Sequence, residues 1–158
     1  MKNIRLVILG EFILFRIVFF FTISLSEARF GAIPYFIEIP SLLMILVILI
    51  PGLFITGVMK DFIKSFSVGI KHFSLLELKN IIGAVSTAQK LILYGALFAI
   101  ITESILLMGN LSDLRAIGPN LAIIFLAGFY AVLLEFLIMP LKLNAERKMN
   151  EEMDLGDE

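Results

Sequence analysis

The chain has 158 residues, of which 59% are hydrophobic and only 17% are charged, and its mean hydropathy is +1.00. Soluble proteins average about 45–50% apolar and about 25% charged residues. A soluble domain this short cannot bury so much apolar surface. The composition therefore excludes a disordered chain, argues against a soluble enzyme and predicts an all-α integral membrane protein.

The charged and reactive residues indicate no catalytic chemistry. The net charge is −1, with 13 Lys+Arg against 14 Asp+Glu, which indicates no nucleic-acid partner. The chain has no cysteine and a single histidine, His72, and it contains no Gly-rich phosphate loop, metal-ligand spacing or nucleophile–base pair. We therefore expect no enzymatic activity, no cofactor and no metal site.

Four apolar windows approach the roughly 20 residues that a membrane helix needs. They span residues 4–24, 40–58, 91–108 and 119–141. A cleaved signal peptide is the alternative for the first window, but this window is longer than the usual apolar core of about 7–15 residues and contains Glu11 and Arg16. We expect one four-helix membrane domain over residues 1–142 and a frayed, acidic cytoplasmic tail over residues 143–158.

The distribution of Lys and Arg predicts the orientation of these helices. Ten of these residues lie in the two ends of the chain and in the connection between the second and third windows, whereas the other two connections hold only Arg29 and Arg115. Basic residues favour the cytoplasmic side. The chain is therefore predicted to cross the bacterial inner membrane several times, with both termini in the cytoplasm.

The connection between the second and third windows is predicted to be structured. Lys60, Lys64 and Lys71 share one face of a helical projection, and the opposite face is apolar, which is typical of an amphipathic helix at the membrane interface. Ser74 and Glu77 have capping-box spacing, so the third helix should begin near Ser74 and continue without a break. Pro119 suits the first position of the fourth helix.

Charges inside the windows are candidate functional residues, because an ionised side chain at the centre of a membrane helix costs about 2.5–3.5 kcal/mol on insertion scales. Arg16 and Glu103 lie at similar depths, ~18 and ~19 Å from the cytoplasmic ends of their helices, so they are candidates for a buried charge pair. A purely structural ion pair is the alternative to a functional one. Glu135 lies level with Glu11, at ~10 Å.

Small residues accompany two of these carboxylates at helical spacing. Such residues allow close helix packing, so each carboxylate should lie on a packing face and not on the lipid face. One interpretation is tight packing around a buried acid, and the other is an ion path. The candidates for packing are Gly95, Ala99 and Ala131, and those for an ion path are Glu135, Glu103, Thr102, Ala127 and Gly128.

Two stretches resemble a known family. Residues 36–42, FIEIPSL, resemble the F-I-D-x-P-S-L sequence at the second helix of flagellar stator MotA proteins. Residues 110–113, NLSD, and 117–122, IGPNLA, followed by Tyr130 and Pro140, resemble the turn and fourth helix of that family. Over most of residues 36–142, the chain resembles a short member of the MotA/TolQ/ExbB proton-channel superfamily that lacks the large cytoplasmic domain.

This resemblance implies a homopentamer around single-span partner helices like those of MotB, TolR or ExbD, in which proton or sodium flow drives mechanical work. The threonines that line the ion path of the family fall here on Ile100, Ala127 and Gly128, and the glycine before the first of them falls on Ala99. Either the path has been rebuilt with carboxylates or the protein is a non-conducting scaffold. A small proton-coupled transporter, which also has four helices and a glutamate in its first span, is a further alternative.

Overall fold

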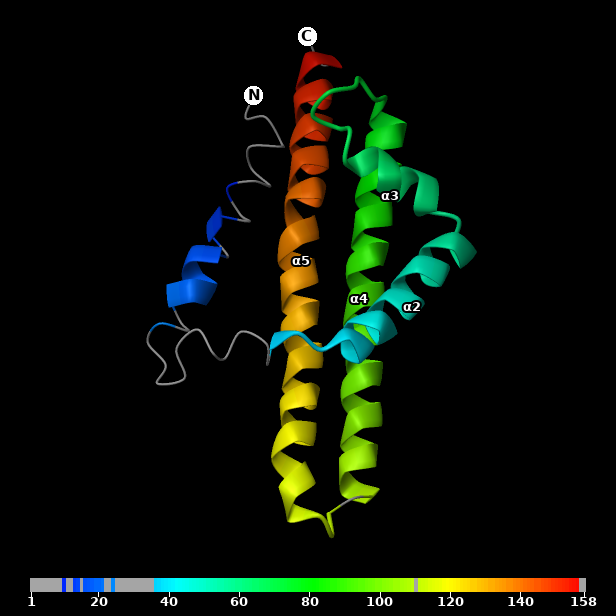
Figure 1. Ribbon diagram of the computed structural model, residues 1–158. Helices are drawn as coiled ribbons and strands as arrows, with labels where there is room; N and C mark the ends of the chain where they lie inside the picture. The colour runs from blue at the N-terminus through cyan, green and yellow to red at the C-terminus, as the bar shows by residue number, and fades with distance from the viewer. Residues whose placement is uncertain are drawn as a thin grey trace.

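The computed structural model describes residue 10, residues 13–14 and 16–21, residue 24, and residues 36–109 and 111–156. This part of the chain is all-helical and contains no strand (Figure 1). From residue 36 onward its helices are α2 (Ile39–Ile55), α3 (Met59–Ser65), α4 (Leu75–Gly109) and α5 (Leu114–Gly156). Much of the first predicted window, 4–24, lies outside the described residues, as does most of the connection that follows it.

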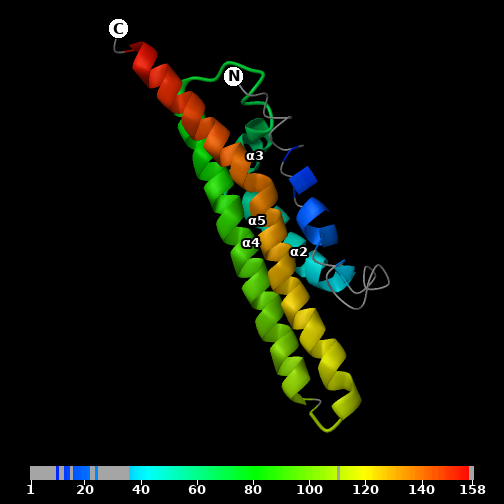
Figure 2. The same cartoon turned by 90° about the vertical axis from the view of Figure 1, so that its left-hand side faces the viewer.

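The two longest helices form an antiparallel hairpin. α4 has 35 residues and α5 has 43, which correspond to ~52 and ~64 Å of helix. Figures 1 and 2 show them side by side along their length, with α2 and α3 against one part of the pair. Both helices are longer than the ~30 Å hydrocarbon core of a bilayer, so each extends beyond the length needed to cross it.

The start of α4 is the capping box that the sequence predicts. The Ser74 Oγ accepts a hydrogen bond from the Glu77 amide at 3.3 Å, and the Glu77 carboxylate accepts one from the Ser74 amide at 3.1 Å. Gly83 lies inside the helix without interrupting it. The prediction of one unbroken helix from near Ser74 is therefore confirmed.

The start of α5 differs from the prediction. The helix begins at Leu114, and Pro119 lies inside it instead of at its first position. Asp113 explains the earlier start, because its carboxylate accepts a hydrogen bond from the Arg115 amide at 3.0 Å and so caps the first turn. Pro119 has no amide hydrogen to donate to the carbonyl of Arg115, and this single loss is tolerable because Arg115 is exposed.

The expectation of a frayed tail is wrong, because α5 continues to Gly156. Ala145 is fully buried in a cluster with Val68, Leu78 and Ile81. The Lys148 ammonium donates hydrogen bonds to the carbonyl oxygens of Val68 and Lys71, at 3.0 and 2.6 Å. These contacts hold the end of α5 against the segment before α4, which the polar composition of the tail did not indicate.

α2 and α3 meet at a sharp bend of 110°. Gly57 lies at the bend with φ +72, a conformation that glycine adopts without steric cost. α3 ends at Ser65, so it is shorter than the predicted amphipathic helix that would include Lys71, and residues 66–70 form turns. Its apolar side chains are also divided, because Phe62 packs against the core while Ile63 and Phe66 are exposed.

The core forms where α2 crosses the hairpin. Its buried residues come from α2, α4 and α5: Ile45, Leu49, Leu53, Ala88, Ile92, Ala96, Leu126, Tyr130 and Ala131. In the described part of the chain, α4 and α5 are long and apolar enough to cross a membrane, and a third span results if the bent α2–α3 pair counts as one. Four spans were expected, and the structure establishes two to three candidates.

Candidate polar site in the helical hairpin

A polar side-chain pair joins α4 and α5 beside the apolar core. The Gln89 Nε2 donates a hydrogen bond to the Glu135 Oε2 at 2.9 Å. Both side chains are half-buried, and their neighbours Ala88, Ile92 and Ala131 are buried. The Glu135 side chain thus accepts a hydrogen bond from the facing helix, as polar groups in membrane helices usually do.

Lys142, seven positions after Glu135, is the basic residue nearest to it along α5. In the structure, the Lys142 ammonium lies 3.9 Å from the Glu146 carboxylate, one turn further along α5. Glu135 therefore interacts across the hairpin with a neutral amide. Nothing in the spacing of charges pointed to Gln89, whose only signal is that it is a polar residue just before the apolar window 91–108.

The small residues of α4 and α5 lie where helices of the same chain approach each other closely. A Cβ atom on Gly95 would lie 2.9 Å from the Cα of Ile45, so α2 approaches α4 at van der Waals distance there. Ala99 and Ala127 are fully buried, and Ala131 is almost so. Gly128 is half-buried, with Ile100 of α4 in ordinary contact distance of where its Cβ would be.

Three further candidate residues have different degrees of exposure. Glu103 and Thr102 are half-buried near the turn end of α4, and Arg16 is exposed. Among the described residues, the salt bridges include none between Arg16 and Glu103. The Arg16–Glu103 pair therefore stays a prediction. Among the candidates that the structure describes, Glu135 and the small residues on its face lie together.

Tyr130 anchors the start of α2 to the hairpin. Its hydroxyl accepts a hydrogen bond from the Glu38 amide at 2.6 Å and donates one to the Phe36 carbonyl at 2.8 Å. The Glu38 carboxylate in turn accepts from the Ser41 amide at 2.6 Å, which caps α2, and Pro40 occupies the first turn. Two stretches that carry the family resemblance therefore meet in space.

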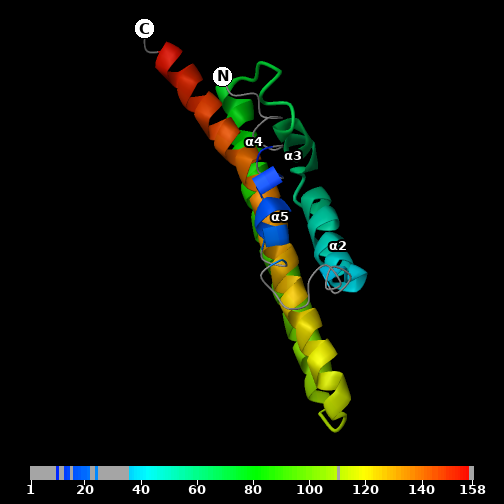
Figure 3. The ribbon, with the colours of Figure 1, turned by 60° about the vertical axis from the view of Figure 1, so that its left-hand side comes forward.

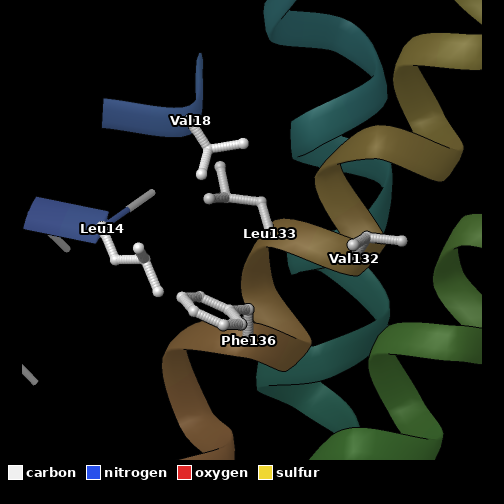
Figure 4. Close-up of a pocket in the computed structure, with 5 residues that line it drawn as sticks. All are labelled: Leu14, Val18, Val132, Leu133 and Phe136. Atoms are coloured by element: carbon white, nitrogen blue, oxygen red, sulfur yellow. The ribbon is translucent and has the colours of Figure 1, made fainter. Parts of the chain in front are cut away.

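An apolar pocket lies between the first helical segment and α5 (Figure 4). Its volume is about 210 Å³, and five side chains line it: Leu14, Val18, Val132, Leu133 and Phe136. No polar atom faces the pocket, so it offers no group that could orient a polar substrate. Among the described residues at this level of α5, the polar side-chain interaction is the Gln89–Glu135 hydrogen bond.

These features define a class: an all-helical protein with two to three helices that can cross a membrane and a polar pair between the two longest. Searches of family models, of curated proteins and of solved structures find no match to the chain.

Proposed function

We propose that the protein is a membrane subunit of the MotA/TolQ/ExbB type, which forms a pentameric ring around a single-span partner and couples proton or sodium flow to mechanical work. In this arrangement four helices cross the bacterial inner membrane, and both termini are cytoplasmic. The first proposed span corresponds to residues 4–24, and α2 supplies the second, over most of residues 40–58.

The observation that carries the proposal is the Gln89–Glu135 pair. An ionisable side chain in the membrane part of a helix is costly, and it is usually retained for function. Glu135 faces α4 and not the lipid, with Ala127 and Ala131 on the same side of α5. A relay role needs a carboxyl group at this place in the hairpin, and the Gln89 amide holds the Glu135 side chain there.

The length of the hairpin supports the same proposal. α4 and α5 continue past the apolar windows into a polar region, where Ala145 and Lys148 hold them to the segment before α4. A rigid extension of this kind would transmit rotation or force to a partner outside the membrane. The resemblance of residues 36–42 and 110–122 to stator subunits adds the expected ring and partner.

A specific observation favours the non-conducting scaffold as the second candidate. Ile100, Ala127 and Gly128 occupy positions where the resembling family has threonines of the ion path, and Ala127 is fully buried. None of these three residues offers a hydroxyl group. A subunit packed this way could form the same ring without passing ions, and the transporter alternative has no comparable support.

The first experiment is the stoichiometry of the full chain, purified from native membranes in mild detergent and measured by native mass spectrometry. Five copies with a foreign single-span protein support the proposal. A monomer, or an antiparallel dimer without a partner, contradicts it, and the dimer indicates the transporter.

The second experiment separates the motor from the scaffold. The complex is reconstituted in liposomes, and proton flux is compared between the wild type, Glu135→Gln and the control Glu151→Gln, which alters an exposed carboxylate on the same helix. A relay role predicts that Glu135→Gln abolishes flux while the ring stays intact. Absence of flux in the wild-type complex favours the scaffold, and normal flux in Glu135→Gln overturns the relay role.

A further inference from the structure

The corner between α2 and α3 exposes several large apolar side chains. Ile55, the last residue of α2, is 85% exposed, and Phe54 beside it is 63% exposed. On α3 and the turn after it, Ile63, Phe66 and Ile70 are each more than half exposed. The segment that holds them, residues 54–71, is called the elbow.

The elbow has two distinct sides. Phe62 and Ser65 face the hairpin, where Phe62 packs against the core and the Ser65 hydroxyl donates to the Phe62 carbonyl at 2.6 Å. Ile63 and Phe66 face away from it, with the Phe66 ring edge-to-face against Phe62 at 5.7 Å between centroids. The inner side thus packs the elbow against the rest of the protein, and the outer side is exposed.

Two lysines border this apolar side. Lys60 lies about one helical turn before Ile63, and Lys71 follows Ile70, and both are exposed. Among the described residues, neither takes part in a salt bridge, whereas Lys64 is neutralised by Asp61 at 3.2 Å and Glu77 at 3.4 Å. The elbow therefore combines apolar side chains with two ammonium groups that pair with no described carboxylate.

The bend gives this combination an orientation. α3 is turned by 110° from α2, so an α2 that crosses the bilayer along its normal places α3 close to the plane of the surface. Figure 3 shows α3 at the end of α2 that points away from the α4–α5 turn. Apolar side chains at that level reach the acyl boundary, and lysine side chains extend to the phosphates.

We propose that the elbow is a binding surface for anionic phospholipid. Ile55, Ile63 and Phe66 insert below the headgroups, and Lys60 and Lys71 bind their phosphates. Charge complementarity and continuity with the apolar helix α2 identify a lipid surface as the occupant. This inference goes beyond the function proposed above and holds for a motor, a scaffold or a transporter alike.

Single-cysteine spin labelling tests the proposal directly, because the chain has no cysteine of its own. Labels are attached to Phe66→Cys and, as a control, to Asn150→Cys, an exposed position on α5. The full chain is reconstituted in nanodiscs of phosphatidylcholine alone or mixed with phosphatidylglycerol. Accessibility to a water-soluble nickel complex and to oxygen then reports the depth of each label.

The expected result is a label at position 66 that is protected from nickel and accessible to oxygen, more so in the anionic nanodiscs, while the control label stays exposed in both. Each of Lys60→Gln and Lys71→Gln should lower the ratio of inserted to exposed label about five-fold, since a basic residue at an anionic surface contributes on that order. Helix content by circular dichroism verifies that these variants fold.

Three outcomes overturn the proposal. A label at position 66 that is as accessible to nickel as the control shows that the elbow lies in water. Protection that is equal in the two lipids, or that survives both lysine substitutions, shows that neutral lipid or a second protein copy covers the surface instead.

Discussion

The two halves of the α4–α5 hairpin have different surroundings. In the half that α2 crosses, nine apolar side chains from three helices form one buried cluster. In the half that leads to the turn, described residues 97–109 and 114–125, Ala99 is the one buried hydrophobic residue. Nine large apolar side chains there are exposed: Leu97, Phe98, Ile101, Ile105, Leu106, Met108, Leu114, Leu121 and Phe125.

The difference arises from where α2 begins. Tyr130 and Glu38 fix its start beside the middle of the hairpin, and α2 then leads away from the turn (Figures 1 and 2). The open half therefore has no third helix among the described residues. In water this surface would be unfavourable, but lipid tails or neighbouring protein helices can cover it without cost. The covered half stabilises the single chain, whereas the open half can contact lipid or neighbouring protein helices.

The largest effect is expected from Ile92→Ala in the covered half. Ile92 is 1% exposed at the contact of α2, α4 and α5. Such truncations cost about 2–5 kcal/mol in soluble cores, and about 2 kcal/mol is expected here, because the cavity remains while transfer to lipid replaces transfer to water. Unfolding of the purified chain in mixed micelles measures this. An unchanged free energy of unfolding would contradict the assignment of this cluster as the core.

The next effect comes from the closest approach of two helices. In Gly95→Ala the new methyl group would meet the backbone of Ile45 at 2.9 Å, so α2 must move. Overpacking of this kind costs about 1–3 kcal/mol.

Gly83→Ala is the matched control for this substitution, because no atom lies within 4 Å of where its methyl group would be and the residue is exposed on the same helix. It should stabilise α4 by about 0.5–1 kcal/mol. Thermal midpoints by circular dichroism should therefore move in opposite directions for the two alanines. Equal shifts would show that α2 does not contact α4 at Gly95.

A smaller effect is expected at the end of the covered half. Ser74→Ala removes the hydroxyl that caps α4 and should lower the free energy of unfolding by about 1 kcal/mol. Hydrogen exchange should accelerate in the first turn of α4 and not at the α4–α5 turn. Faster exchange throughout the helix would instead indicate that the first turn of α4 does not open independently of the rest.

The smallest effect on the single chain is expected from Phe125→Ala in the open half. The side chain is 69% exposed, so its removal should change the free energy of unfolding by no more than about 0.5 kcal/mol. If the open half contacts other copies in a ring, the same variant should lower the fraction of oligomer in native mass spectrometry. A large loss of stability in the monomer would show that Phe125 is packed within the chain, and would contradict the difference between the two halves.

Local patterns in the sequence correctly predicted several elements. The apolar windows predict α4 and α5, because a long apolar helix leaves a continuous hydrophobic signal. The Ser74–Glu77 spacing predicts the start of α4, since a capping box involves only neighbouring residues. The same local reasoning failed where distant contacts decide: α5 continues through the polar tail because Ala145 and Lys148 contact residues near position 70.

The residues of the candidate site also differ in whether local sequence patterns predict them. The sequence alone identified Glu135 and the small residues on its helix face, because charge and helical spacing are properties of a single segment. Only the tertiary structure identified Gln89 as its partner, 46 positions away, and Tyr130 as the anchor of α2. A hydrogen bond between helices depends on their register, and register is set by the summed packing of side chains such as Ile45 on Gly95, which no local pattern encodes.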